Sequence, residues 1–190
     1  QLGILQVNTA KTIYEEVAMT DIKRAAEILE PMNRIDSDDG FISLEVDPTL
    51  SDDAEGTIEE GIRLYKTIAY DNVMIKVPAT KAGYKAMEEL SSQGINVNAT
   101  LIFSPEQAIS CANALNRGME KSITESKAVI SIFVSRFDRL CDNEFGAKGI
   151  EKAKLGIINA VKCYHEINKF HNDNIRTLFA STGVKGDELP

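Results

Sequence analysis

The feature that most constrains this chain of 190 residues is a repeated alternation of short β-branched runs with longer amphipathic segments. The β-branched runs predict strands over residues 41–46, 73–77, 96–103, 128–134 and 177–181. Helical periodicity predicts helices over residues 9–30, 52–70, 80–92, 104–117 and 148–168. Alternating strands and helices indicate a parallel sheet, either open and doubly wound or closed as a (β/α)8 barrel.

Local signals predict where several helices begin and end. Residues 104–107, Ser-Pro-Glu-Gln, combine an N-cap serine, a proline at the first helical position and a glutamine three residues after the serine. Gly94 and Gly118 lie where C-terminal glycines are expected. We also expect the N-terminal helix to restart at Thr20-Asp21 and a loop to follow it over residues 31–40.

Polar side chains are confined to one face of the predicted strands, because successive side chains of a strand point to opposite faces. The polar face carries Ser43, Glu45, Asp47, Lys76, Asn96, Asn98, Thr100 and Ser131, and the other face carries Ile42, Leu44, Val46, Ile75, Val77, Val97, Ala99, Leu101, Phe103, Ile130, Ile132 and Val134. An open sheet covered by helices should be apolar on both faces. One polar face, with its polar groups mostly late in the strands, favours a (β/α)8 barrel with an active site at the carboxyl ends of the strands.

Composition restricts the classes of function. A net charge of −8 opposes binding to nucleic acid and to anionic membranes, and no run of 18 apolar residues predicts a membrane span. The three cysteines, Cys111, Cys141 and Cys163, form no CxxC pair, and the chain has only two histidines. This composition favours a reduced, cytoplasmic protein without a metal site. We expect a single domain over residues 1–190.

Lys76 lies in the otherwise apolar run VMIKVPAT, residues 73–80. An ammonium is costly to bury, so such a lysine pairs with a carboxylate, reaches the surface, or loses its proton. A structural ion pair with Glu45 is one interpretation. The other is an amine nucleophile that forms a Schiff base with a ketone sugar, with Glu45 transferring protons directly or through one water. Asn98 and Thr100 either hold the amine and the substrate hydroxyls or merely line the barrel.

Two basic residues follow predicted strands at the end where a barrel binds its ligand. Arg136 comes just after the strand that carries Ser131, and Lys185 lies in a glycine-bearing loop that begins at Ser181. Loops after the late strands of a barrel commonly hold phosphate. His165 lies on a predicted helix without a recognisable partner, and we do not expect it to be catalytic.

Five segments in order resemble the motif set of the transaldolase family, in its longer bacterial form. They are DGFISLEVDP (39–48), IKVPAT (75–80), GINVNATLIFSPEQA (94–108), SIFVSRFD (131–138) and FASTGVK (179–185). The resemblance implies a (β/α)8 barrel of the class I aldolase type that needs no metal or organic cofactor. It also implies a place in the non-oxidative pentose phosphate branch of carbohydrate metabolism and allows a homodimer.

The activity that the resemblance implies is transfer of a three-carbon dihydroxyacetone unit between phosphorylated sugars. The donor is a ketose phosphate, sedoheptulose 7-phosphate or fructose 6-phosphate, and the acceptor is an aldose phosphate, glyceraldehyde 3-phosphate or erythrose 4-phosphate. In this resemblance Lys76 matches the Schiff-base lysine and Glu45 matches the acid/base glutamate. Asn98 and Thr100 match the residues that position the lysine and a water. The substrate and phosphate contacts are matched by Ser131, Arg136, Ser181 and Lys185.

The sequence also departs from the family pattern. Two strands that the family has before the one bearing Glu45, with an acid/base aspartate and an Asn-Pro motif, are not found, and neither is the eighth strand. We therefore expect an incomplete barrel, a fragment of a longer protein, whose open sheet edges reduce its stability. Two alternatives stay open: a fructose 6-phosphate aldolase, which releases dihydroxyacetone, and a non-catalytic phosphosugar-binding fragment.

Overall fold

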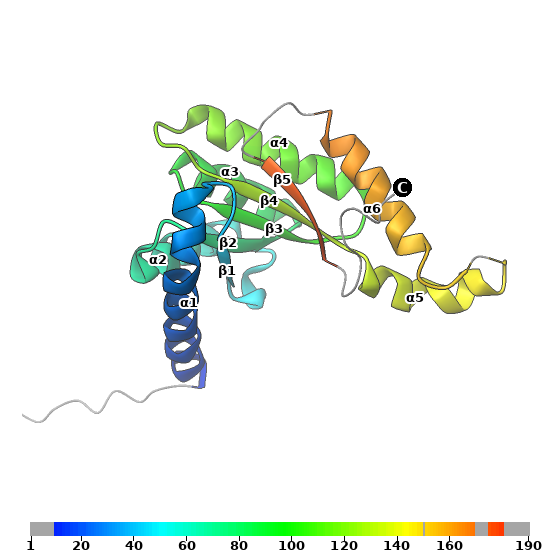
Figure 1. Cartoon of the computed structure of the whole chain (residues 1–190), viewed down its shortest axis with the longest axis horizontal. Helices are drawn as coiled ribbons and strands as arrows, with labels where there is room; N and C mark the ends of the chain where they lie inside the picture. The colour runs from blue at the N-terminus through cyan, green and yellow to red at the C-terminus, as the bar shows by residue number, and fades with distance from the viewer. Residues whose placement is uncertain (1–9, 150, 170–174, 181–190) are drawn as a thin grey trace, which may run out of the picture.

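Five parallel strands form one sheet in a computed structural model that describes residues 10–149, 151–169 and 175–180 (Figure 1). The strands β1 (Ile42–Glu45), β2 (Val73–Pro78), β3 (Val97–Ile102), β4 (Ala128–Phe133) and β5 (Ile175–Ala180) pair in chain order. The helices are α1 (Ala10–Ile35), the short 3-10 helix η1 (Pro48–Leu50), α2 (Ala54–Ile68), α3 (Lys81–Ser92), α4 (Pro105–Lys121), α5 (Ser135–Gly146) and α6 (Leu155–Ile167). Parallel strands in chain order with intervening helices confirm the α/β fold and are consistent with an incomplete (β/α)8 barrel.

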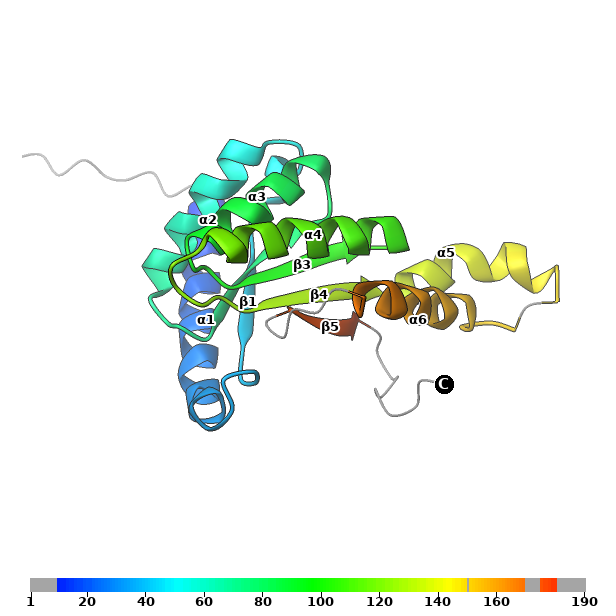
Figure 2. The same ribbon diagram turned by 90° about the horizontal axis from the view of Figure 1, so that it is seen from above.

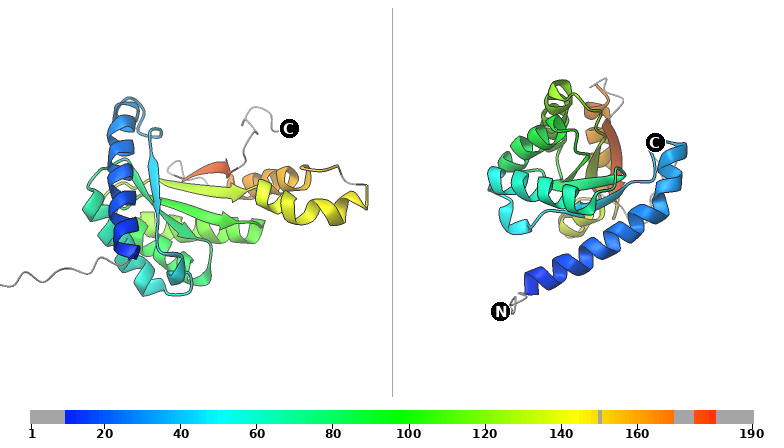
Figure 3. Two further views of the ribbon diagram at one scale, coloured as in Figure 1. Left: turned by 90° about the horizontal axis from the view of Figure 1, so that it is seen from below. Right: turned by 90° about the vertical axis from the view of Figure 1, so that its left-hand side faces the viewer.

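The helices cover one face of the sheet. Helices α2, α3 and α4 lie side by side over it, and α6 continues this layer beside β4 and β5 (Figure 2). Helix α1 runs along the β1 edge, and α5 projects from the opposite end of the molecule next to α6 (Figure 3). In the described part of the chain, no helix combines the length and the apolar character that crossing a membrane requires.

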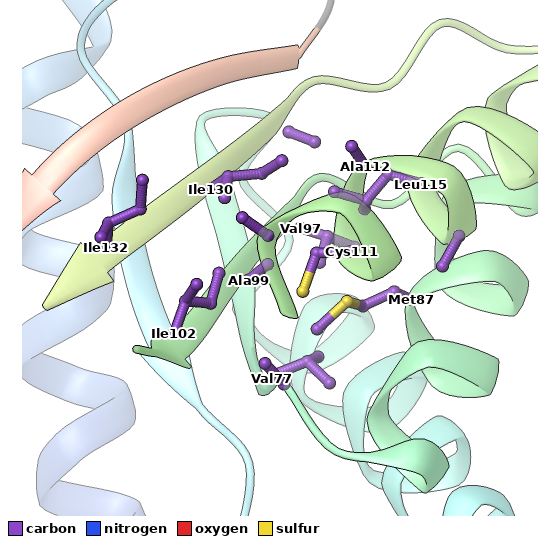
Figure 4. Packing of buried hydrophobic residues seen from close by; sticks show 14 of the residues in the cluster. Val77, Met87, Val97, Ala99, Ile102, Cys111, Ala112, Leu115, Ile130 and Ile132 are labelled. Atoms are coloured by element: carbon purple, nitrogen blue, oxygen red, sulfur yellow. The ribbon is translucent and has the colours of Figure 1, made fainter. Parts of the chain in front are cut away.

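The hydrophobic core fills the space between the sheet and this helical layer. Val77, Val97, Ala99 and Ile130 project from β2, β3 and β4 toward α3 and α4 and are fully buried (Figure 4). They meet Met87, Cys111, Ala112 and Leu115, which are also fully buried. These strand residues belong to the predicted apolar face, so the alternation of side chains correctly assigned which side of the sheet the helices cover.

Helix α1 is longer than the sequence predicts. It runs unbroken from Ala10 to Ile35, so the predicted restart at Thr20-Asp21 and the start of the loop at residue 31 are both wrong. The Thr20 hydroxyl donates to the Glu16 carbonyl oxygen at 2.8 Å, as a threonine inside a helix can, and does not cap a new helix. Pro31 lies in the last turns, where the missing N–H removes a single hydrogen bond.

The two predicted terminal glycines have different roles. Gly94 has φ +75° just after α3, as a C-terminal glycine should. Gly118 lies inside α4, and a Cβ there would come within 2.3 Å of the Glu88 carbonyl oxygen. Gly118 therefore permits close contact between α3 and α4, and the prediction that it ends a helix is wrong.

The predicted helix over residues 148–168 corresponds to α6, which begins later, at Leu155. Helix α5 was not predicted, although its apolar residues Phe137, Cys141 and Phe145 recur at helical spacing; Asp138 is its one buried residue among those the structure describes. The Asp138 carboxylate accepts a 2.6 Å hydrogen bond from the Gly156 amide and thereby joins α5 to the start of α6.

Candidate active site

Three of the predicted site residues lie side by side across the polar face of the sheet. Glu45 of β1 is paired in register with Lys76 of β2, and Lys76 with Asn98 of β3. Lys76 is half-buried in a strand whose other residues are all buried, Asn98 is 8% exposed, and Glu45 is exposed at the end of β1. The register thus places an amine between a carboxylate and an amide.

The Lys76 amine has no carboxylate partner among the residues that the structure describes. The ion pairs of this region join Lys11 to Asp47 and Glu60, and Arg63 to Glu15. The structural ion pair between Lys76 and Glu45, one of the two interpretations of the sequence, is therefore not formed. The Lys76 amine is therefore not held in an ion pair by a described residue and could reach a substrate carbonyl.

The Asn98 side chain is held from both sides by serine hydroxyls. Its Nδ2 donates to Ser43 Oγ at 3.0 Å, and Ser131 Oγ donates to its Oδ1 at 2.8 Å. Asn98 and Ser131 were both predicted site residues, and the structure brings them into direct contact. Ser43 was placed on the polar face by alternation, yet nothing in the sequence distinguished it from an ordinary strand serine.

Strand β3 is irregular after Asn98, and the prediction that Leu101 lies on the apolar face is wrong. Leu101 has φ +57°, and the pairing with β4 shifts between Ala99 and Ile102. Ala99 and Ile102 both face the helices, so Leu101 does not lie on the apolar face as alternation predicts. This β-bulge turns Leu101 toward the cavity beside β1 and leaves Thr100 buried at 1% exposure, paired with Pro78.

Side-chain caps fix the segments that follow β2 and β3. Thr80 Oγ1 accepts from the Gly83 amide at 2.9 Å, which starts α3, and donates to the Ser51 carbonyl at 2.6 Å. Ser104 caps α4 as predicted, accepting from the Gln107 amide at 3.3 Å. Gln107 also joins the two segments, accepting from Phe103 N at 2.9 Å and donating to Ala79 O at 3.2 Å. The carboxyl ends of the two central site strands are therefore rigidly connected.

A cavity of about 470 Å³ lies at the β1 edge of this row. Glu45, Leu101 and Arg136 line it together with residues 44–48, with α1 and with Glu60 and Leu64 of α2. Lys76 does not line this cavity; its neighbour in register, Glu45, does. Glu45 and Arg136 therefore line the same cavity, and Lys76 lies on the next strand, outside it.

Arg136 is supported by an aromatic stack at the carboxyl end of the sheet. Its guanidinium carbon lies 4.6 Å from the centre of the Phe133 ring, and Phe133 stacks on Phe103 with ring centres 5.5 Å apart. Arg136 is exposed and forms no ion pair with a described carboxylate. A guanidinium held in this way can bind phosphate in a bidentate manner.

Helix α1 closes the cavity through ionic contacts. Lys11 pairs with Asp47, and Arg63 of α2 pairs with Glu15 and Glu60. The hydrogen bond from Lys11, together with those from Thr49, holds the pKa of the Asp47 carboxyl well below its usual range. Asp47 shares the strand face of Glu45, but its contacts mark it as a structural group.

Two predicted site residues, Ser181 and Lys185, lie outside the described residues. Among the residues that are described, no group of three His, Cys, Asp or Glu side chains is placed to hold a metal ion.

Residues 2–190 match the Transaldolase/Fructose-6-phosphate aldolase family. The chain belongs to this family. It is 49% identical over 197 residues to the "Transaldolase" of Campylobacter jejuni subsp. jejuni serotype O:23/36 (strain 81-176), with 98% of this chain and 59% of that protein covered. It is 46% identical over 189 residues to the "Transaldolase" of Helicobacter pylori (strain Shi470), with 100% of this chain and 58% of that protein covered.

The chain therefore spans about three-fifths of the length of these relatives of the family. The match confirms the family resemblance that the five motifs indicate, and it includes every predicted site residue from Glu45 to Lys185.

Proposed function

We propose that this chain is the Schiff-base-bearing part of a transaldolase, a transferase of cytoplasmic carbohydrate metabolism in the non-oxidative pentose phosphate branch. The observation that carries the proposal is the row Glu45–Lys76–Asn98, in which a half-buried lysine without a described carboxylate partner lies between a carboxylate and an amide. The substrates would be the ketose and aldose phosphates that the family resemblance implies.

The proposed chemistry begins at Lys76. Its neutral amine adds to the C2 carbonyl of the ketose, and loss of water gives an iminium ion. The C3–C4 bond then breaks: its electron pair stays in the three-carbon enamine on Lys76, a base takes the C4 hydroxyl proton, and the aldose phosphate leaves. The enamine carbon attacks the carbonyl carbon of the acceptor aldehyde while the protonated base returns its proton to the aldehyde oxygen, and hydrolysis of the new iminium releases the product and the amine.

The other residues would serve particular steps. Glu45 would transfer the protons of carbinolamine formation and dehydration, directly or through one water. Asn98 and Thr100 would position the amine and that water, and Ser131 would contact the substrate hydroxyls. Arg136, held over Phe133, would bind the phosphate, with Ser181 and Lys185 as further contacts.

A transfer assay on the complete protein tests this function and separates it from the second activity in the family's name. Fructose 6-phosphate and erythrose 4-phosphate should give sedoheptulose 7-phosphate and glyceraldehyde 3-phosphate. Lys76→Ala should abolish the products, whereas Lys85→Ala, at an exposed site on α3, should not. Free dihydroxyacetone formed without acceptor would instead indicate a fructose 6-phosphate aldolase. Absence of both products would overturn the proposal and leave a non-catalytic phosphosugar-binding role.

A further inference from the structure

The amide of Asn98 is oriented entirely by side chains. Its Nδ2 donates to Ser43 Oγ at 3.0 Å, and its Oδ1 accepts from Ser131 Oγ at 2.8 Å. Asn98 is 8% exposed and Ser131 7%, so water has little access to this pair. In such surroundings the two serine hydroxyls determine how the amide plane lies.

Asn96, two residues earlier on the same face, shows what a purely structural amide does in this sheet. Its Nδ2 donates to the carbonyl oxygens of Asp71 at 2.7 Å and Val73 at 3.2 Å, and its Oδ1 accepts from the Lys127 amide at 2.8 Å. These bonds satisfy backbone groups where the strands begin. Both partners of the Asn98 amide are instead side-chain hydroxyls, so its bonds to Ser43 and Ser131 serve the orientation of the amide itself.

The bond between Ser43 and Asn98 passes directly beside the base of Lys76. Ser43 of β1 is paired in register with Met74 of β2, and Asn98 of β3 with Lys76. A hydrogen bond from β1 to β3 must therefore cross β2 between Met74 and Lys76. The strands of a barrel are staggered in this sense, so that side chains of non-adjacent strands meet on the inner face.

We propose that Ser43 is a positioning residue for the amine of Lys76, acting through the amide of Asn98. The inference rests on the proposed Schiff-base function of Lys76. Each serine hydroxyl holds one end of the Asn98 amide. Loss of one hydroxyl therefore leaves the amide anchored at one end and free to turn. A small displacement of a group that aligns a nucleophile slows the reaction by one to two orders of magnitude.

The test is the rate at which borohydride traps a fructose 6-phosphate adduct on Lys76 in the complete protein. Ser43→Ala should lower this rate about 10- to 100-fold, and Ser43→Thr, which keeps the hydroxyl, should restore most of it. Asn98→Ala should be at least as slow, and adding Ser43→Ala to Asn98→Ala should slow it no further. The last comparison separates action through Asn98 from an independent effect.

A second readout does not depend on substrate. The Asn98 side-chain amide protons should exchange with solvent faster in Ser43→Ala than in the unaltered protein, as measured by NMR, while the backbone amides of β3 keep their protection. If Ser43→Ala fails to fold, the nearly isosteric Ser43→Cys takes its place, and its weak hydrogen bonding should give an intermediate trapping rate.

The two proposals fail in different ways. No adduct in the unaltered protein would overturn the Schiff-base function on which the role of Ser43 depends. An adduct that forms as fast in Ser43→Ala as in the unaltered protein would overturn the role of Ser43 alone. That role would also be overturned if Ser43→Ala slowed trapping by the same factor with and without Asn98.

Discussion

At the scale of single residues, Gly83 lets the start of α3 approach the end of the strand that carries Lys76. The strand that carries Lys76 ends at Pro78, and α3 begins three residues later under the Thr80 cap. Gly83, in the first turn of α3, lies so near this strand end that a Cβ would come within 1.9 Å of the Pro78 carbonyl oxygen. No side chain other than hydrogen fits there without moving the end of β2.

Gly83→Ala should therefore destabilise the fold by about 1–3 kcal/mol through overpacking. Gly146→Ala is the matched control, because a Cβ at Gly146 meets no atom within 4 Å and alanine favours a helix. Urea unfolding should show a loss for the first variant and no loss for the second. Equal stability of the two variants would mean that α3 does not approach β2 this closely.

Most of the residues that the structure brings together at the candidate site could be predicted at this scale, because their residue types are unusual in an apolar strand. Lys76 stands out as a charge in an apolar strand, and strand alternation places Glu45, Asn98 and Ser131 on its face. Ser43 could not be singled out, since its importance lies in a contact across an intervening strand. The aromatic stack that supports Arg136 could not be predicted from the sequence either, because Phe103 and Phe133 come into contact only in the folded sheet.

At the scale of elements, the bulge in β3 is where a sequence rule fails for a physical reason. Alternation assumes a regular pleat, but Leu101 adopts φ +57°, and the strand places two residues where the pattern expects one. The residue type at position 101 does not predict the bulge, because leucine does not favour the left-handed region. Helix α5 is a different case, since its apolar residues Phe137, Cys141 and Phe145 recur at helical spacing and the helix was predictable.

Substitutions at Leu101 test the bulge directly. Asparagine tolerates the left-handed region, whereas a β-branched residue does not, so Leu101→Val should be less stable than Leu101→Asn by about 1–2 kcal/mol. Thermal and urea unfolding of both variants provide the comparison. A more stable valine variant, as expected for a regular strand, would contradict the bulge.

The contact between α1 and the cavity rim should depend on pH through Asp47. Its pKa is lowered in the folded protein from an ordinary value of 3.8, so its stabilising effect is complete above that value and is lost as the pH falls through the folded pKa. Lys11→Met removes the main cause of this shift. Its deficit in unfolding free energy should therefore be largest at neutral pH and shrink toward about pH 2.

Unfolding in urea at several pH values measures this deficit. Lys85→Met, at an exposed position outside the ion pairs of the described residues, is the control and should show no such trend. A Lys11→Met deficit that stays constant from neutral to acid pH would show that the pair with Asp47 does not hold α1 in place.

At the scale of the whole molecule, the two faces of the sheet differ: one is apolar and the other carries the residues of the candidate site. Its helix-covered face contains the buried core, and its other face carries the row from Glu45 to Asn98 and the hydroxyls of Ser43 and Ser131. The side that the helices cover was predictable from alternation along the chain, and pairing in chain order is the order that the favoured barrel requires. The lengths of α1 and α4 were not, because Pro31 and Gly118, which often mark the end of a helix, both lie inside one here.

The central claim is that Lys76 forms a covalent Schiff base with a ketose phosphate, and locating the trapped adduct tests it most directly. After incubation with fructose 6-phosphate and borohydride, mass spectrometry of proteolytic peptides should find a reduced three-carbon adduct on the peptide that contains Lys76. Lys76→Ala should carry no adduct, and Lys85→Ala should carry it as the unaltered protein does. An adduct on another lysine, or one that survives Lys76→Ala, would contradict the claim.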